Sequence, residues 1–139
     1  MSERDERSPV WGIEWDFLAV DADGRVACLS SAGFGPIPDR VLAHQLLVER
    51  AMAEVEDLPV LGPAEDRRDT DDRAGNYADW FRMSECGLFA YDWHNGAYRL
   101  VSAPTKGVEP SALSSTIRQA ANLLALPLRF AEEPCLNVE

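Results

Sequence analysis

The side chains best suited to catalysis are a cysteine, a histidine and an aspartate that lie close together in the sequence. Cys86, His94 and Asp92 have the residue types of a nucleophile, its base and the group that orients the base. Cys86 is expected at the end of a helix, where the helix dipole raises the pKa of a thiol instead of lowering it. We therefore predict no catalytic residues and expect that the protein is not an enzyme.

Two short motifs have some features of ion-binding loops. Residues 21–24, Asp-Ala-Asp-Gly, match the start of a calcium loop, but the residues that follow supply neither the third oxygen ligand nor the distal glutamate. Residues 33–36, Gly-Phe-Gly-Pro, precede a predicted helix, but they lack the glycine spacing and the lysine of a phosphate-binding loop. We interpret the two motifs as a hairpin turn and a strand-to-helix turn. Two histidines and three cysteines without HxxxH or CxxC spacing add no metal site, so we predict no metal and no cofactor.

The charge of the chain is its clearest functional property. The 139 residues carry 24 acidic and 13 basic side chains, which gives a formal net charge of −11. A protein that binds nucleic acid or an anionic membrane surface needs a basic face, so we expect neither partner. An acidic surface is compatible with a basic protein partner.

Acidic residues near a tryptophan are candidates for the site that binds such a partner. Exposed aromatic side chains beside carboxylates are typical of an interface that holds a basic protein. The segment 57–75, the hairpin turns and the C-terminal tail hold most of the candidates. The predicted partner-binding residues are Asp21, Glu65, Asp66, Asp69, Asp71, Asp72, Asp92 and Trp93.

Two hairpins and three helices must position these residues. Alternating apolar residues flank Asp23-Gly24 in the first half of the chain and Asn95-Gly96 in the second, and both dipeptides favour tight turns between antiparallel strands. Apolar residues at helical spacing predict helices over residues 39–56, 76–85 and 111–125. Residues 126–131 contain a proline and are expected to form an edge strand.

These elements predict an α+β domain: an antiparallel sheet of about five strands, built from two hairpins and an edge strand, with helices packed on one face. We expect a single domain over residues 11–131, preceded by a disordered arm (1–10) and followed by an acidic tail (132–139). Residues 57–75 are expected to form an acidic loop inside that domain.

The stretches EWDFLAVDADGRVACLSSAGFGPIP (14–38) and GLFAYDWHNGAYRLVSAPTKG (87–107) resemble small bacterial proteins of arginine-rich proteomes. In size and charge these are similar to immunity proteins of polymorphic and contact-delivered toxin systems. The resemblance implies a non-catalytic module that binds a basic toxin domain and occludes its active site. The alternative is a small enzyme or ligand-binding domain with a pocket between sheet and helices, lined by Tyr77, Tyr91, Tyr98 and His44.

The chain contains neither a signal-peptide pattern nor an apolar run of membrane-spanning length. We therefore expect a cytoplasmic protein whose three cysteines are unpaired.

Overall fold

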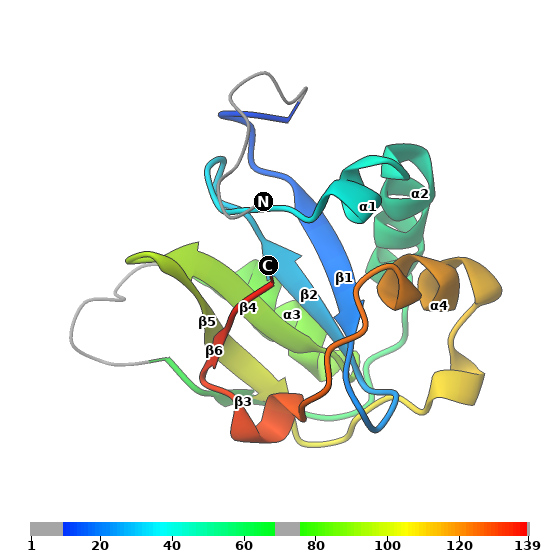
Figure 1. Ribbon diagram of the computed structural model, residues 1–139. Coiled ribbons are helices and arrows are strands. Elements are labelled where there is room, and N and C mark those ends of the chain that lie inside the picture. The colour runs from blue at the N-terminus through cyan, green and yellow to red at the C-terminus, as the bar shows by residue number, and fades with distance from the viewer. Residues whose placement is uncertain (1–9, 69–75, 139) are drawn as a thin grey trace.

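A computed structural model describes residues 10–68 and 76–138 as one sheet with helices around it (Figure 1). The strands are β1 (Asp16–Val20), β2 (Val26–Ser30), β3 (Ala64–Asp66), β4 (Phe89–His94), β5 (Ala97–Pro104) and β6 (Cys135–Leu136). The α-helices are α1 (Asp39–Leu42), α2 (Gln45–Glu56), α3 (Ala78–Glu85) and α4 (Ser115–Asn122). Two short 3-10 helices, η1 (Pro110–Ala112) and η2 (Phe130–Glu132), complete the order. The predicted α+β class is confirmed.

The sheet is mixed, so the prediction of a purely antiparallel sheet is wrong. Its strand order is β1-β2-β4-β5-β3, and β6 also pairs with β5. β2 and β4 run parallel, with Ala27 opposite Phe89 and Ser30 opposite Asp92. A parallel pair needs a long crossover between its strands. Here α1, α2, β3 and α3 form that crossover.

Both predicted hairpins are present. β1 and β2 pair antiparallel from Asp16 opposite Ser30 to Val20 opposite Val26, and the turn between them is longer than two residues. β4 and β5 are joined by Asn95 (φ 50°) and Gly96 (φ 78°). Positive φ at both central residues is the geometry that matches the twist of the two strands.

The sheet buries apolar side chains on both of its faces. Phe17 and Ala19 of β1 belong to one core cluster, whereas Leu18 between them belongs to a second. The first cluster also contains Val41 of α1 and residues of the C-terminal segment, which crosses the front of the sheet in Figure 1. The second contains Ile117 of α4 and is lined by Met83 of α3. The helices are therefore divided between two clusters.

Two predicted helices have different bounds in the structure: one is interrupted and the other starts later. The helix expected over residues 39–56 breaks after Leu42, where His44 leaves the helical conformation (φ −125°, ψ 40°) and becomes the residue that precedes α2. The helix expected over residues 111–125 starts later as α4, because Ser114 accepts a hydrogen bond from the Ile117 N–H and caps it there.

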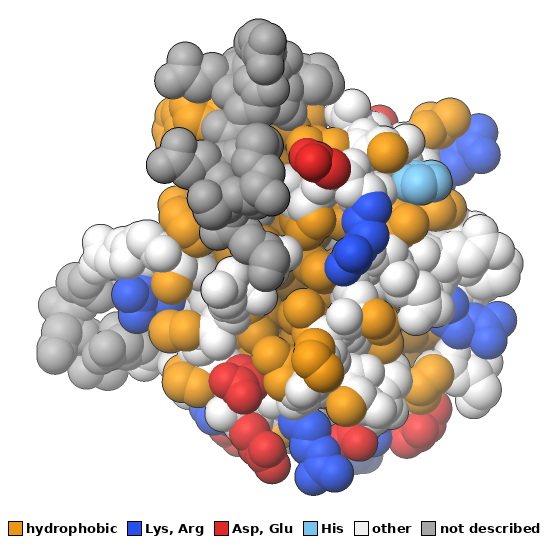
Figure 2. All heavy atoms as spheres, viewed as in Figure 1, with side chains coloured by type: hydrophobic (Ala, Val, Ile, Leu, Met, Phe, Trp, Pro, Cys, Tyr) orange, Lys and Arg blue, Asp and Glu red, His pale blue; other side chains and the backbone are white. Residues whose placement is uncertain are grey.

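The C-terminal part of the chain differs most from the prediction. Residues 126–131 do not form an edge strand; only Ala125 bridges to Val20, and η2 follows. The expected acidic tail instead contains β6, and Leu136 and Val138 are buried in the first core cluster. Figure 2 shows hydrophobic side chains down the middle of this face, with many charged side chains along its lower edge.

The segments predicted to lack structure are also partly ordered. β3 lies within the expected loop 57–75 and pairs with the end of β5. Val10, in the expected N-terminal arm, is buried. Residues 1–9 and 69–75 lie outside the described residues.

Candidate functional site

A cleft opens where β1 begins, between α2 and α3. Its inner chamber has a volume of about 300 Å³ and is lined by Asp16, by Val55 and Glu56 of α2, and by Asp79 and Arg82 of α3. It continues outward past Glu14 and Glu49. We call the region bounded by Glu14, Asp16, Glu49, Glu56 and Asp79 the acidic cleft. Among the described residues that line it, Arg82 is the single basic side chain.

Local sequence explains how these carboxylates reach the cleft. Asp16 is the first residue of β1 and shares a sheet face with Leu18, so it continues the row of side chains that forms the second core cluster. Asp79 lies in the first turn of α3, where the helix dipole stabilises a negative charge. Glu56 is the last residue of α2, and the last turn of that helix contains no basic residue. A negative charge at this end of a helix opposes the dipole, so the helix does not stabilise the charge of Glu56.

Asp16 is the carboxyl group of the cleft whose environment most disfavours the charged form. Its Oδ1 atom is fully enclosed and has no hydrogen-bond partner among the described residues. Burial raises its pKa to about 6; a hydrogen bond with Ser30 lowers it, and the charges of Glu14, Asp92 and Asp79 raise it further. The Asp16 Oδ1 atom is therefore a buried acceptor without a donor in the described part of the chain. It lies in a cleft where carboxylates outnumber basic side chains.

Trp80 of α3 contributes a second unsatisfied polar atom to the same place. A small hollow beside the inner chamber is lined by both Asp16 and Trp80. The indole Nε1 is enclosed and has no acceptor in the described part of the chain. Buried polar atoms are almost always paired, and exceptions often mark functional positions. Two residues that line one hollow thus each hold a buried polar atom without a partner in the described part of the chain.

The thiols near the cleft are not activated. The Cys86 Sγ donates a hydrogen bond to the Leu58 carbonyl at 3.3 Å, and an Arg82 Nη1 donates to Cys86 Sγ at 2.9 Å. Burial raises the pKa of Cys86, in the predicted direction, and this outweighs the lowering effect of the Arg82 charge. Burial also raises the pKa of Cys28. Both thiols stay protonated at neutral pH, which makes them poor nucleophiles.

The sequence suggested that Asp21 lies on an exposed rim, but the structure buries it. It is 8% exposed. Its Oδ1 accepts hydrogen bonds from the N–H groups of Asp23 and Arg25, and its Oδ2 accepts one from the Phe130 N–H. Asp21 therefore fixes the first turn and ties it to the C-terminal segment.

Asp92 and Trp93 are also less exposed than a rim requires. Asp92 is 8% exposed and lies beside Ser30, where its charge contributes to the raised pKa of Asp16. Trp93 is half-buried and packs edge-on against Tyr98, with ring centroids 5.1 Å apart. Asp92 is therefore largely buried, whereas Trp93 keeps part of its surface exposed.

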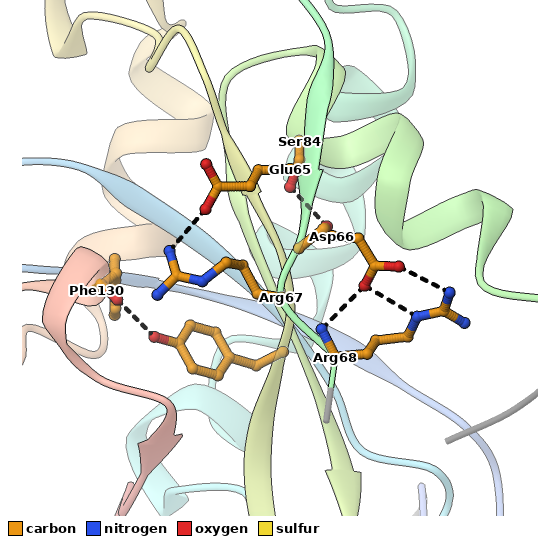
Figure 3. A network of polar contacts seen from close by, with 8 residues as sticks. Glu65, Asp66, Arg67, Arg68, Ser84 and Phe130 are labelled. Carbon is orange, nitrogen blue, oxygen red and sulfur yellow. Dashed lines mark hydrogen bonds and ion pairs between the residues drawn. The ribbon is translucent and has the colours of Figure 1, made fainter. Parts of the chain in front are cut away.

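Glu65 and Asp66 are exposed on β3, but their charges are balanced locally. Glu65 pairs with Arg67 at 3.1 Å and Asp66 with Arg68 at 2.9 Å, as Figure 3 shows. The Arg68 guanidinium also lies over the Tyr77 ring. The other predicted residues of this segment, Asp69, Asp71 and Asp72, lie outside the described residues.

The four residues predicted to line a pocket between sheet and helices lie elsewhere than in the acidic cleft. The hydroxyl groups of Tyr91 and Tyr98 are bonded to backbone carbonyls in the core. His44 is exposed before α2, and Tyr77 packs on Trp80. None of these four side chains lines the acidic cleft.

Sequence reasoning missed the five carboxylates of the cleft, although two of them carried a signal. Asp16 stands at an inward position of an otherwise apolar strand, and Glu56 ends a helix without a compensating base. Charged residues in such unfavourable places are candidates for function.

No protein-family model, curated protein or solved structure matches the chain. Within residues 10–68 and 76–138, no group of three or more His, Cys, Asp or Glu side chains is arranged to hold a metal ion. None of the helices formed by these residues has the length and apolar character needed to cross a membrane.

Proposed function

We propose that the protein is a non-catalytic module that binds a basic protein and acts as an inhibitor of the immunity-protein type. The observation that carries this proposal is Asp16, whose enclosed Oδ1 lacks a donor in a cleft bounded by four other carboxylates. A cationic side chain of a partner would supply that donor. It would also offset the two effects that raise the pKa of Asp16, which are burial first and the neighbouring negative charges second.

The overall charge supports the same function. A net charge of −11 attracts a basic partner over distance, and charges near the binding surface then increase the rate of association. Charge pairs that lose their water on binding can also contribute affinity. Inhibition by occlusion needs affinity and position only, which agrees with thiols that remain protonated.

The proposal is tested by capture followed by an inhibition assay. The tagged full chain and the variant Glu14→Gln/Glu56→Gln/Asp79→Asn serve as paired baits in lysate of the native host. We expect the wild-type bait to retain a basic protein that the variant retains less, as read by mass spectrometry. The captured protein is then expressed and its toxicity or enzymatic activity measured with increasing amounts of the wild-type chain.

Activity that falls to zero at an equimolar ratio supports the proposed function. Activity that is unchanged when the partner is saturated would overturn it, because a bound protein that does not block its partner is not an inhibitor. Failure to retain any protein at low ionic strength would also count against it.

A small-molecule function is the second candidate, and the open acceptor of Asp16 and donor of Trp80 favour it. Their shared hollow fits an amine or a guanidine better than an anion, because of the surrounding carboxylates. Thermal unfolding with arginine, agmatine and spermidine tests it. A saturable rise in Tm that is absent in Asp16→Asn would favour this function over protein binding.

A further inference from the structure

An exposed apolar patch lies in the two loops that flank the first hairpin. We call Trp11, Ile13 and Phe34 the apolar patch. Ile13 is 59% exposed and Phe34 is 57% exposed, values that are high for side chains of this size. The Trp11 and Phe34 rings meet edge to face with centroids 5.4 Å apart.

The backbone holds this patch in place. The Gly12 N–H donates a hydrogen bond to the Gly33 carbonyl at 2.9 Å, which joins the loop before β1 to the loop after β2. The two loops lie at the same end of the molecule in Figure 1. Gly33 has φ +89°, and a Cβ there would lie 3.3 Å from the Gly12 carbonyl carbon. The close approach of the loops therefore depends on glycine, and it displays two aromatic rings on a fixed support.

The apolar patch is continuous with the acidic cleft along the chain. Glu14, which lines the cleft, directly follows Ile13, and three residues from Trp11 to Glu14 span at most about 10 Å. Trp15 fixes the connection: its N–H donates to Ser31 Oγ at 3.0 Å and its indole N–H to Glu49 at 3.3 Å. The apolar side chains and the carboxylates thus lie on adjoining segments of the chain, which Trp15 links by hydrogen bonds to Ser31 and to Glu49 of the cleft.

We propose that this combined surface docks one segment of a partner protein, in which an apolar side chain is followed by arginine or lysine. The apolar side chain packs on Trp11 and Phe34, and the cationic side chain enters the cleft toward Asp16. This inference rests on the proposed function and identifies where and by what chemistry the partner binds.

Charge complementarity selects the occupant. The cleft presents five carboxylates and one arginine, so it attracts a cationic segment and repels an acidic one. A second copy of this chain carries the same net charge of −11 and is therefore disfavoured. Aromatic anchors beside desolvated charge pairs are the arrangement in which a few residues supply most of the binding energy.

The test selects peptides from a random library displayed on phage, with the full chain immobilised. Selected peptides are then measured by fluorescence polarisation against four proteins. These are the wild type, the cleft variant Glu14→Gln/Glu56→Gln/Asp79→Asn, the patch variant Ile13→Ser/Phe34→Ser, and the control variant Glu65→Gln/Glu109→Gln/Glu132→Gln. The control removes the same charge as the cleft variant from exposed positions elsewhere. Melting temperatures establish that each variant is folded.

We expect selected peptides to combine an apolar residue with arginine or lysine. Their affinity should fall about tenfold or more in the cleft variant and in the patch variant, and less than about twofold in the control. Equal losses in the cleft and control variants would overturn the inference, because binding would then follow net charge alone. Peptides that lack basic residues would overturn it as well.

Two further results separate this inference from the proposed function. A partner that inhibition assays confirm, but that binds the cleft and patch variants as tightly as the wild type, would leave the function standing and refute the surface. Sedimentation that shows a dimer, lost in the patch variant, would assign the patch to a second copy and would also refute the inference.

Discussion

Asp16 is a residue that costs stability in the free protein. Its pKa is raised to about 6 from an ordinary value of 3.8, mainly by burial, so folding disfavours its charged form. The folded state binds a proton more tightly than the unfolded state between these two values. Stability therefore falls as the pH rises through this window, and at neutral pH the full cost of at most about 3 kcal/mol is present.

The first prediction is that Asp16→Asn stabilises the protein at neutral pH. Asparagine removes the charge and keeps an acceptor for Ser30, so the free energy of unfolding should rise by about 1–2 kcal/mol. The difference should shrink as the pH falls and vanish below about pH 3, where the wild-type group is protonated in the folded and unfolded states. Urea unfolding at a series of pH values measures it.

The exposed carboxylate Glu132 is the control for that experiment. Glu132→Gln should change stability by no more than about 0.5 kcal/mol across the same pH range. If Asp16→Asn is less stable than the wild type at neutral pH, the carboxylate is stabilised by contacts other than those described. Asp16 would then no longer support a binding role for the acidic cleft.

The second prediction concerns a buried tyrosine. The Tyr91 hydroxyl donates towards the Glu133 carbonyl at 2.7 Å and lies 3.2 Å from the Phe130 carbonyl, and burial raises its pKa well above the usual range (Figure 3 shows the contact with Phe130). Tyr91→Phe should lower the free energy of unfolding by about 1–2 kcal/mol, because the C-terminal segment loses its attachment to β4. Thermal or urea unfolding measures this.

Tyr98→Phe provides the matched comparison, since the Tyr98 hydroxyl donates to the Pro36 carbonyl. We expect a smaller loss, about 1 kcal/mol. A neutral effect of Tyr91→Phe would show that the C-terminal segment is held by its apolar residues, Leu136 and Val138, and not by this hydrogen bond.

At the scale of elements, the two hairpins are set by different kinds of turn. In the β4–β5 turn Asn95 and Gly96 both have positive φ, and a Cβ at Gly96 would meet nothing within 4 Å. The Arg99 side chain of β5 donates hydrogen bonds to the His94 and Asn95 carbonyls of this turn. The β1–β2 turn depends on a side chain, since Asp21 accepts two backbone N–H groups of the turn and one from Phe130. The first turn is therefore held in part by a contact with a distant segment of the chain, whereas the Arg99 contacts of the second turn are local.

The third prediction follows from that difference. Gly96→Val should destabilise the protein by more than about 1 kcal/mol, because a β-branched residue is strained at φ 78° even where space is open. Gly96→Asn should cost clearly less, since asparagine tolerates this conformation. Urea denaturation of both variants makes the comparison; equal stabilities of valine variant and wild type would contradict the turn geometry.

At the scale of the whole molecule, the charge of −11 is unevenly compensated. The β3 segment balances its own carboxylates with Arg67 and Arg68, whereas the acidic cleft has Arg82 for five carboxylates. Charges that are already paired contribute little to attraction at short range. We therefore expect the cleft to dominate recognition of a basic partner.

The fourth prediction compares two triple variants that remove equal charge. Glu14→Gln/Glu56→Gln/Asp79→Asn should slow association with the captured partner, flatten its salt dependence and speed dissociation about tenfold or more. Asp69→Asn/Asp71→Asn/Asp72→Asn should slow association and leave dissociation nearly unchanged. Surface plasmon resonance at two ionic strengths separates the two rates; faster dissociation in the second variant alone would return the binding site to the segment 57–75.

The sequence by itself determined the local parts of this protein. The Asn-Gly turn with its flanking apolar runs, the start of α3 after Asn76, and the α+β class all follow from residues that are neighbours in the chain. Turn and capping preferences act over a few residues, so they can be recognised without knowledge of the rest of the fold.

Only the tertiary structure decided that β2 pairs with β4 and that the carboxylates of the acidic cleft lie close together. The parallel pairing joins strands separated by the whole crossover, and its energy comes from burial of apolar residues that no local pattern specifies. Burial of Asp21 requires the Phe130 N–H, which lies far along the chain. The acidic cleft likewise requires α2 and α3 to bring Glu56 and Asp79 to Asp16. Contacts between distant residues depend on packing of the whole molecule, and for this reason the cleft became visible in three dimensions only.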